Sequence, residues 1–341
     1  MGEKQIGVGI VGCGTILQAH LQAIKANQNL KLIGVTDNDY GKAVQYAETS
    51  QCKVYRNNLS LIEDPNVQLV VLLTPPIYHK ESITACALNG KHVLAEKPIG
   101  TRIEDVNSVV EICKEKNVVF SVVSQHRFDP ASRIAKDKIE RQAFGKLRGA
   151  NCIVNWYRED EYYNNTWRRT SEMAGGGVLP IQAIHTIDLM LWLMGEVDSV
   201  MAYTSKDGHD DIEVEDNAMA CIKFKNGSLA VISATTCAYP GYPSRLDIFG
   251  MDGSISIEGD EVTFYHSRKE GDSPVAIGVK GEVVSNPGKV SVESINAQYA
   301  DVIYSILNQT APLVTGDEAR KVFKLIDAIY QSSRLGKEIK L

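Results

Sequence analysis

The first part of the chain alternates short apolar runs with helical patterns. The runs are almost continuously apolar, which is typical of parallel strands whose sheet is covered by helices on both faces. They span residues 5–11, 30–36, 67–73, 92–95 and 118–124. Helical patterns separate them at residues 15–27, 40–50, 77–89 and 103–117. This alternation predicts a doubly wound α/β domain of the Rossmann type over residues 1–124.

A different pattern follows residue 124. A helix is predicted at 130–142 and a strand at 147–157, followed by strand-like runs at 197–204, 218–224, 228–236, 245–250, 254–258 and 261–266. Asn226-Gly227 lies between two of these runs, where a hairpin requires a turn. Residues 125–341 are therefore expected to form an α+β domain with a large, mostly antiparallel open sheet. Thr315-x-x-Glu318 is a capping box that predicts a closing helix, ended by Gly336.

Composition and charge exclude several classes of protein. The 341 residues are 44% hydrophobic and 23% charged, as in an ordinary globular protein. A net charge of −6 without a basic run disfavours nucleic acid as a partner. No unbroken apolar stretch approaches the length of a membrane span, and the N-terminus lacks a signal-peptide or myristoylation pattern, so a cytoplasmic location without membrane contact is expected. Seven cysteines without a C-x-x-C pair predict reduced thiols, mostly in the core, and no metal site.

A glycine-rich turn is the first candidate binding feature. Gly12-Cys13-Gly14 lies between the first predicted strand and a helix, where glycines let the backbone approach a pyrophosphate at the helix N-terminus. Leu17 replaces the third glycine of the usual fingerprint, so an ordinary turn is the alternative interpretation. The residues of this turn expected to bind a dinucleotide are Gly12, Gly14, Thr15 and Ile16.

An acidic residue at the end of the second strand indicates which dinucleotide is bound. Asp37 lies where a carboxylate would accept hydrogen bonds from the adenosine ribose. Asp39 follows, and no arginine is nearby to receive a 2′-phosphate, so we expect NAD in preference to NADP. The alternative role for Asp37 is that of a helix N-cap.

Two further motifs follow strand ends, where open α/β sheets bind ligands. They are Thr74-Pro75 with His79, and Glu96-Lys97-Pro98. The residues of these motifs expected to bind the cofactor are Thr74, Pro75, His79, Glu96 and Lys97. Lysines are usually surface residues, but Lys97 stands in a strand-end turn before a proline.

Later in the chain, the triple glycine 175–177 leads into a segment with several polar side chains. Gln182 and His185 are candidate site residues, and His185 shares a helix face with Asp188. A core histidine is the alternative for His185.

These motifs, in this order and spacing, resemble the glucose-fructose oxidoreductase, inositol dehydrogenase and MocA family (Gfo/Idh/MocA). The resemblance implies an NAD(P)-dependent dehydrogenase that transfers a hydride at a secondary alcohol of a sugar, sugar nucleotide or cyclic polyol. It implies proton transfer by Lys97, whose pKa a nearby nicotinamide cation would lower toward a useful range. It also implies a cis peptide between Lys97 and Pro98, and a His185 that orients the hydroxyl or shares its proton.

One position departs from the inositol dehydrogenase pattern. Ile181 stands where such members carry an aspartate four residues before the histidine, which puts inositol specificity in doubt. The stretch 177–185 is similar to the branch of UDP-N-acetylglucosamine-uronate 3-dehydrogenases, which favours a sugar or sugar-nucleotide substrate.

Aromatic and basic residues supply candidate substrate contacts, because aromatic rings stack on sugars and arginines bind phosphate or carboxylate. The residues expected to bind substrate are Lys97, Gln125, Arg127, Tyr157, Trp167, Arg168, Gln182 and His185, with Arg158, Tyr163 and Arg169 close by in the sequence. For the arginines, a surface loop with solvated charges is the alternative.

Two other functions are compatible with this fold: an NAD- or sugar-sensing regulator, and a redox-neutral enzyme that recycles bound NAD. The presence of both Lys97 and His185 favours the dehydrogenase over the sensor. An apolar sheet face in the second domain has to be covered, so a homodimer or homotetramer through that sheet is expected.

Overall fold

The computed structural model describes residues 5–164, 166–270 and 292–341. The chain divides into two compact units, Met1–Gln125 with Gly288–Arg320, and His126–Pro287 with Lys321–Leu341. Helix α9 (Val292–Asn308) therefore groups with the N-terminal unit, whereas the sequence pattern placed all residues after 124 in the second domain.

The first unit contains a six-stranded parallel sheet in the order β3-β2-β1-β4-β5-β6, which is the Rossmann order. Every residue of β1 and β4 is buried, which explains why the strands read as unbroken apolar runs. The strands are β1 (Ile6–Val11), β2 (Leu30–Thr36), β3 (Lys53–Val54), β4 (Leu69–Leu72), β5 (His92–Ala95) and β6 (Phe120–Val122). The helices between them are α1 (Leu17–Ala26), α2 (Tyr40–Ser50), α3 (Asn58–Ile62), the short η1 (Pro76–Tyr78), α4 (His79–Leu88) and α5 (Ile103–Glu115). The predicted Rossmann domain is confirmed.

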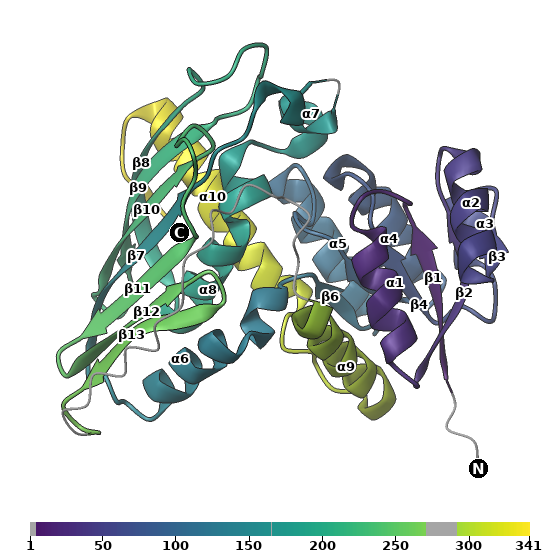
Figure 1. The fold of residues 1–341 in the computed structure, drawn as a ribbon, viewed down its shortest axis with the longest axis horizontal. Helices are drawn as coiled ribbons and strands as arrows, with labels where there is room; N and C mark the ends of the chain where they lie inside the picture. The colour runs from purple at the N-terminus through teal and green to yellow at the C-terminus, as the bar shows by residue number, and fades with distance from the viewer. Residues whose placement is uncertain (1–4, 165, 271–291) are drawn as a thin grey trace. The chain divides into compact units, whose positions relative to one another are not determined.

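Three elements of this unit were not predicted from the sequence: the short β3 and α3, and the long α9. Helix α9 packs against α1 (Figure 1), and its buried apolar side chains join the core of the parallel sheet. These side chains are Ile295, Tyr299, Val302 and Ile303. The first core is thus completed by residues from late in the sequence.

The second unit contains an eight-stranded mixed sheet in the order β13-β12-β11-β7-β10-β9-β8-β14. Neighbouring strands are antiparallel except for the β7–β10 pair, as the predicted hairpins require. The strands are β7 (Leu147–Asn155), β8 (Val197–Ser205), β9 (Asn217–Phe224), β10 (Leu229–Thr235), β11 (Arg245–Gly250), β12 (Gly253–Glu258), β13 (Glu261–Ser267) and β14 (Ile339–Lys340).

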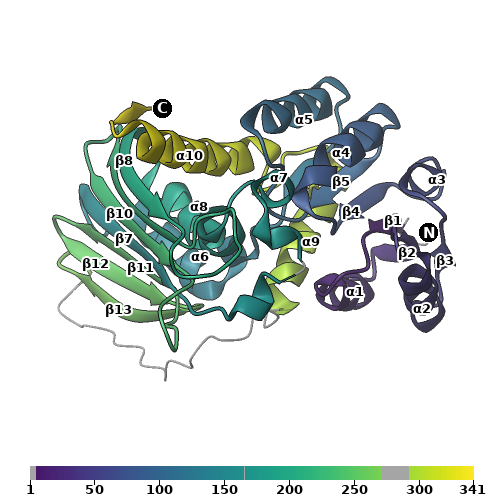
Figure 2. The same ribbon diagram turned by 90° about the horizontal axis from the view of Figure 1, so that it is seen from above.

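Helices cover one face of this sheet. Those whose side chains join the core against the sheet include α6 (Pro130–Glu140), α8 (Ile184–Met194) and α10 (Gly316–Leu335). The shorter helices are η2 (Gln125–Phe128), η3 (Asp160–Tyr162), η4 (Trp167–Arg169), α7 (Ser171–Ala174) and η5 (Leu179–Ala183). The second core lies between the sheet and helices α8 and α10 (Figure 2). Among the described residues, no helix covers the opposite sheet face.

Local turn and capping signals match their expected positions. Asn226-Gly227 connects β9 to β10, and Gly227 has the positive φ of 83° that favours glycine. The Thr315 hydroxyl accepts the backbone N–H of Glu318 at 3.2 Å, as a capping box requires. Gly336, with φ 62°, follows the last helix.

The stretch Ser171–Met194 meets the length and composition criteria for a membrane span, with a mean hydropathy of 1.4. This stretch is not an unbroken apolar run, so the sequence pattern did not indicate it. However, 78% of its most apolar window is buried inside the structure, and α8 contributes to the second core. Burial within the protein thus accounts for the apolar character of this segment.

Candidate active site

The turn after β1 leaves the N-terminus of α1 open. Gly12 has φ 103°, and a Cβ atom there would lie 2.9 Å from the Leu73 carbonyl carbon, so only glycine fits. A Cβ atom on Gly14 would point into open space. Helix α1 has no side-chain cap, because its N-cap residue is Ile16. The exposed backbone N–H groups of this helix end are suited to bind a pyrophosphate.

Asp37 follows β2 and is tied to the glycine turn. Its Oδ2 atom accepts the backbone N–H of Cys13 at 2.6 Å, and its Oδ1 accepts that of Asp39 at 2.8 Å. The N-cap of α2 is Asp39, which accepts the N–H of Lys42, so the alternative N-cap role for Asp37 is wrong. The half-buried Asp37 carboxylate retains lone pairs that can accept ribose hydroxyls.

Thr74 and Pro75 form the turn after β4, and the His79 side chain contacts the backbone of this turn. The His79 side chain is fully buried, and its Nε2 donates to the Thr74 carbonyl at 2.9 Å. Burial lowers the pKa of His79, so its ring is neutral and supports the turn. The Thr74 hydroxyl is buried without a hydrogen-bond partner. This unpartnered hydroxyl and the open helix end fit an NAD molecule bound along the strand ends.

Lys97 is held at the end of β5 by a buried hydrogen-bond chain. The predicted cis peptide between Lys97 and Pro98 is confirmed. Glu96 Oε2 accepts the backbone N–H of Lys97 at 3.1 Å, and Glu96 Oε1 lies 3.1 Å from His20 Nε2. The other ring nitrogen of His20 lies 2.9 Å from the Tyr299 hydroxyl on α9. A neutral His20 satisfies this chain, because Nε2–H donates to Glu96 while Nδ1 accepts from Tyr299.

The charge of Glu96 is stabilised by this arrangement. Burial raises the pKa of the Glu96 carboxyl, but the hydrogen bond from His20 and the nearby Lys97 charge outweigh it, so the net pKa is lowered. An ionised Glu96 therefore lies next to Lys97 at neutral pH.

In the second unit, a short π-helical segment precedes His185. The π segment is η5, and α8 continues from it, with Gln182 in η5 and His185 in the first turn of α8. Single π turns inside helices are frequent at functional sites. The His185 ring lies edge-on to His126, with centroids 5.2 Å apart.

A buried carboxylate anchors the start of this segment. Glu215 accepts the backbone N–H groups of Gly177 at 2.7 Å and Leu179 at 2.9 Å, and the Tyr330 hydroxyl at 2.8 Å. A Cβ atom on Gly177 would lie 1.8 Å from the Glu215 carbonyl oxygen. The triple glycine therefore allows a close backbone approach that fixes the position of the following helix.

Arg127 pairs with Asp188 in the interior. The Arg127 side chain is 1% exposed, and its Nε and one terminal nitrogen lie 2.8 and 2.6 Å from the two Asp188 oxygens. Asp188 shares α8 with His185, as expected. This pair suits Arg127 to hold the helix that carries His185, and its predicted contact with substrate stays a prediction.

A cluster of arginine and aromatic side chains, which we call the arginine wall, surrounds Tyr162. The guanidinium groups of Arg158 and Arg168 lie 5.6 and 4.8 Å from the Tyr162 ring, and Gln182 Nε2 donates to its hydroxyl at 2.7 Å. Trp167 packs on Arg168 at 4.8 Å. Arg158 is 4% exposed, and burial together with the Arg168 charge lowers its pKa.

No described carboxylate forms an ion pair with Arg158 or Arg168, and the Nε atom of each is buried without a hydrogen-bond partner. Two neighbouring guanidinium groups without an anion are costly in a protein interior unless a ligand neutralises them.

Two other residues were predicted to contact substrate. Gln125 is 5% exposed, and its Oε1 atom has no hydrogen-bond partner. The Tyr157 ring packs edge-on against Tyr239, with centroids 5.1 Å apart, and the Tyr157 carbonyl accepts a hydrogen bond from the Arg158 guanidinium at 2.9 Å. Lys97 belongs to the first compact unit and His185 to the second.

Sequence reasoning missed Tyr162, the centre of the arginine wall, and the partners of Glu96. Tyr162 is next to Tyr163 in the sequence, and only its burial and contacts in the structure show that Tyr162 is the ring between the two arginines. His20 carried a weak signal, because it is a histidine on the apolar face of α1. Tyr299 lies on the helix that was not predicted.

Comparison with known proteins follows the division into two domains. Residues 6–124 match a model described as an oxidoreductase family with an NAD-binding Rossmann fold, and residues 132–256 match the Gfo/Idh/MocA C-terminal domain. The chain is 29% identical to myo-inositol 2-dehydrogenase of Thermotoga maritima, over 78% of this chain and 79% of the relative. It is 31% identical to levoglucosan dehydrogenase of Pseudarthrobacter phenanthrenivorans, over 58% of this chain and 56% of the relative.

Among solved structures, the WlbA dehydrogenase of Bordetella pertussis in complex with NADH and UDP-GlcNAcA is similar over 99% of both chains, with a TM-score of 0.88 and 28% identity.

Proposed function

Because the chain belongs to the Gfo/Idh/MocA family of NAD-binding oxidoreductases, we propose that it oxidises or reduces a ring hydroxyl carbon of an acidic sugar or sugar nucleotide. The observation that carries the substrate class is the arginine wall. Arg158 and Arg168 lack a described carboxylate partner, so a carboxylate or diphosphate of the substrate would supply the missing negative charge. A solved relative that binds UDP-GlcNAcA supports this class.

Lys97 and His185 handle the hydroxyl proton in this proposal. Bound NAD⁺ supplies a hydride acceptor for the carbinol carbon. In the oxidative direction, the neutral amine of Lys97 takes the hydroxyl proton at Nζ and becomes an ammonium group, while a ring nitrogen of His185 orients the substrate oxygen. The ionised Glu96 stabilises the resulting ammonium charge. In the reductive direction, Lys97 returns the proton.

The cofactor would be held by the strand-end turns of the first unit. The open end of α1, formed by Gly14, Thr15 and Ile16, would hold the pyrophosphate, and Asp37 would accept hydrogen bonds from the ribose hydroxyls. A carboxylate at this position repels a 2′-phosphate, which supports NAD over NADP.

We test the function with the purified protein, NAD⁺ or NADH, and a panel of neutral sugars, uronic acids and UDP-linked uronates, following absorbance at 340 nm. The Lys97→Ala variant is expected to lower kcat by about 10²- to 10⁴-fold while NADH binding stays unchanged. The Arg158→Met variant is expected to raise KM for acidic substrates only. Absence of turnover with every substrate, or turnover of neutral sugars alone, contradicts the proposal. NAD retained through purification without net turnover would instead favour a redox-neutral enzyme.

The uncovered face of the second sheet is proposed to bind a second copy of the chain. It carries exposed apolar side chains from neighbouring strands and a groove of about 540 Å³ lined by Met201, Cys221, Leu229, Val231 and Phe249 among others. Monomers rarely leave such a continuous apolar sheet face in water. A two-fold pairing of the same face buries it in both copies.

A further inference from the structure

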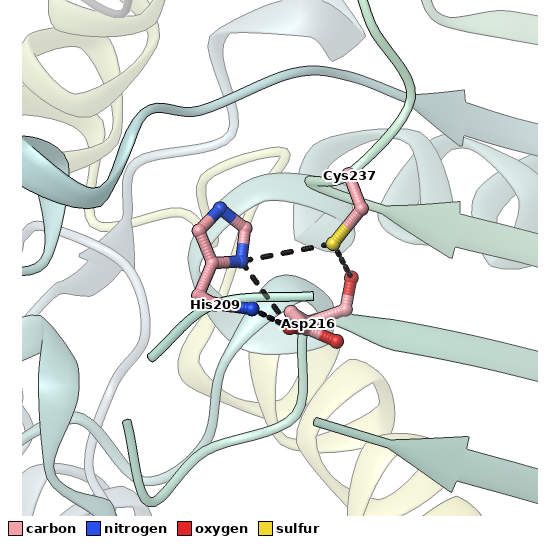
Figure 3. A group of neighbouring side chains, drawn as sticks. All are labelled: His209, Asp216 and Cys237. Carbon is pink, nitrogen blue, oxygen red and sulfur yellow. Dashed lines mark hydrogen bonds and ion pairs between the residues drawn. The ribbon is translucent and has the colours of Figure 1, made fainter. Parts of the chain in front are cut away.

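Three side chains with metal-binding chemistry meet at one end of the second sheet. His209 lies in the loop between β8 and β9, Asp216 directly precedes β9, and Cys237 follows β10. Because Thr235 pairs with Asn217 across the antiparallel β9–β10 ladder, Asp216 and Cys237 are brought together at the same sheet end. Figure 3 shows His209 Nδ1 next to both the Asp216 carboxylate and the Cys237 thiol, and the thiol next to the Asp216 backbone carbonyl.

The spacing of the donor atoms suits a tetrahedral ion. His209 Nδ1 lies 3.2 Å from Asp216 Oδ2 and 3.6 Å from Cys237 Sγ, and one donor atom from each residue lies within 4.8 Å of the others. Metal–ligand bonds of about 2.0–2.3 Å in a tetrahedron separate nitrogen, oxygen and sulfur ligands by about 3.3–3.7 Å. Both distances from the ring nitrogen are close to this spacing.

The orientation of the imidazole is fixed from the other side. His209 Nε2 lies 2.8 Å from the Arg158 carbonyl, which can only accept, so Nε2 carries a hydrogen. In the neutral ring the lone pair of Nδ1 then faces Asp216 and Cys237. Metal-binding histidines commonly donate their second ring N–H to a backbone carbonyl in this way. A lone pair that faces a carboxylate oxygen is unfavourable unless a positive charge lies between them.

The cluster is held in place before any ion binds. Asp216 is 1% exposed, and its Oδ2 atom accepts the backbone N–H groups of Gly208 at 2.8 Å and His209 at 3.0 Å. The second oxygen, Oδ1, is buried without a hydrogen-bond partner. A Cβ atom on Gly208 would lie 2.1 Å from Cys237 Sγ, so glycine permits the close approach. Cys237 is exposed, which leaves a route for an ion and a water ligand.

We propose that His209, Asp216 and Cys237 bind one divalent ion of the zinc class, with water as the fourth ligand. A nitrogen, sulfur and oxygen donor set selects Zn²⁺ over the harder Mg²⁺ and Ca²⁺. The cluster has no C-x-x-C spacing, so the cysteine pattern of the sequence gave no sign of it.

The ion would act on the arginine wall through the backbone. His209 bonds to the Arg158 carbonyl and its ring packs on Tyr163 at 4.8 Å, while the Tyr163 hydroxyl lies 3.0 Å from that of Thr236. A bound ion would therefore restrain the segment that carries Arg158. Its binding does not depend on hydride transfer or on the identity of the substrate.

The test uses untagged full-length protein stripped of metal with a chelator and then titrated with Zn²⁺ or Co²⁺ alone. We expect one Zn²⁺ per chain by calorimetry, a thiolate-to-cobalt charge-transfer band, and a raised Tm with Zn²⁺. Cys237→Ser should remove the band and weaken Zn²⁺ binding at least about tenfold, because a thiolate ligand is lost. Asp216→Asn, which keeps an oxygen acceptor for the two backbone N–H groups, should also weaken binding.

Cys52→Ser is the control, because Cys52 is a partly exposed free cysteine that belongs to the other compact unit. It should bind Zn²⁺ like the wild type. No stoichiometric binding by the wild type, or wild-type affinity in both Cys237→Ser and Asp216→Asn, overturns the proposal.

Discussion

Replacing Asp37 by alanine tests the proposed role of this carboxylate in cofactor recognition. The Asp37 carboxylate accepts backbone N–H groups from Cys13 and Asp39, and we propose that it also accepts the ribose hydroxyls of NAD. The Asp37→Ala variant removes all of these acceptors and the negative charge.

The expected loss follows from the hydrogen-bond chemistry. A hydrogen bond to an ionised acceptor contributes about 1.5–3 kcal/mol, so losing one such bond weakens NADH binding about 10- to 150-fold. Loss of the charge also removes repulsion of a 2′-phosphate, so the preference for NADH over NADPH should narrow.

NADH fluorescence enhancement measures this binding without a substrate. Asp39→Ala is the matched control, because Asp39 caps α2 through Lys42. Loss of that cap costs about 1 kcal/mol of unfolding free energy, which lowers Tm, and it should leave the Kd for NADH unchanged. Thermal melting of Asp37→Ala shows that the variant is folded. Wild-type NADH affinity in Asp37→Ala, or a wild-type protein that prefers NADPH, would refute the reasoning.

Three further predictions concern stability and assembly. Because the pKa of Glu96 is lowered, its ionised form stabilises the fold above the ordinary carboxyl pKa of about 4.3, and this stabilisation is lost as pH falls through the lowered pKa. In urea unfolding, Glu96→Gln should therefore have a lower free energy of unfolding than the wild type at pH 7, and the difference should shrink in acid. An equal difference at all pH values would contradict this. Arg127→Met should lower the free energy of unfolding by about 3–5 kcal/mol, because it leaves Asp188 charged and unpaired. The double variant Arg127→Met with Asp188→Leu should recover most of this loss. An Arg127→Met protein as stable as the wild type would argue against a buried ion pair. In light scattering, Leu229→Asp on the uncovered sheet face should dissociate the oligomer and Leu59→Asp on the first unit should not; a monomeric wild type would rule out the proposed pairing.

The sequence predicted those parts of the fold that depend on local patterns. The buried strands β1, β2, β4, β5 and β6 were recognisable because both faces of a parallel sheet select apolar residues. The hairpin turn at Gly227 and the cap at Thr315 depend on backbone chemistry that a few residues specify. The two-residue strand β3 is too short to show a period.

The missing elements of the site have a different cause. Helix α9 has a regular apolar stripe that a search for helical periodicity can find, but the stripe does not say which core it joins. His20, Glu96 and Tyr299 are far apart in the sequence and meet only after folding. Arg127 and Asp188 likewise meet only after folding. The sequence indicated both residues but not that they form an ion pair.

The late position of α9 affects how the protein is made. Residues 5–125 contain every strand of the parallel sheet, but Tyr299 and Gln298, which bond to His20 and to the backbone of Ser124, lie about 170 residues further along. At a synthesis rate of roughly 5–20 residues per second, the nascent nucleotide-binding unit waits on the order of ten seconds or more for its last helix. During that time the apolar surface beside α1 is uncovered, so a truncated chain that ends near residue 125 should depend on chaperones to stay in solution.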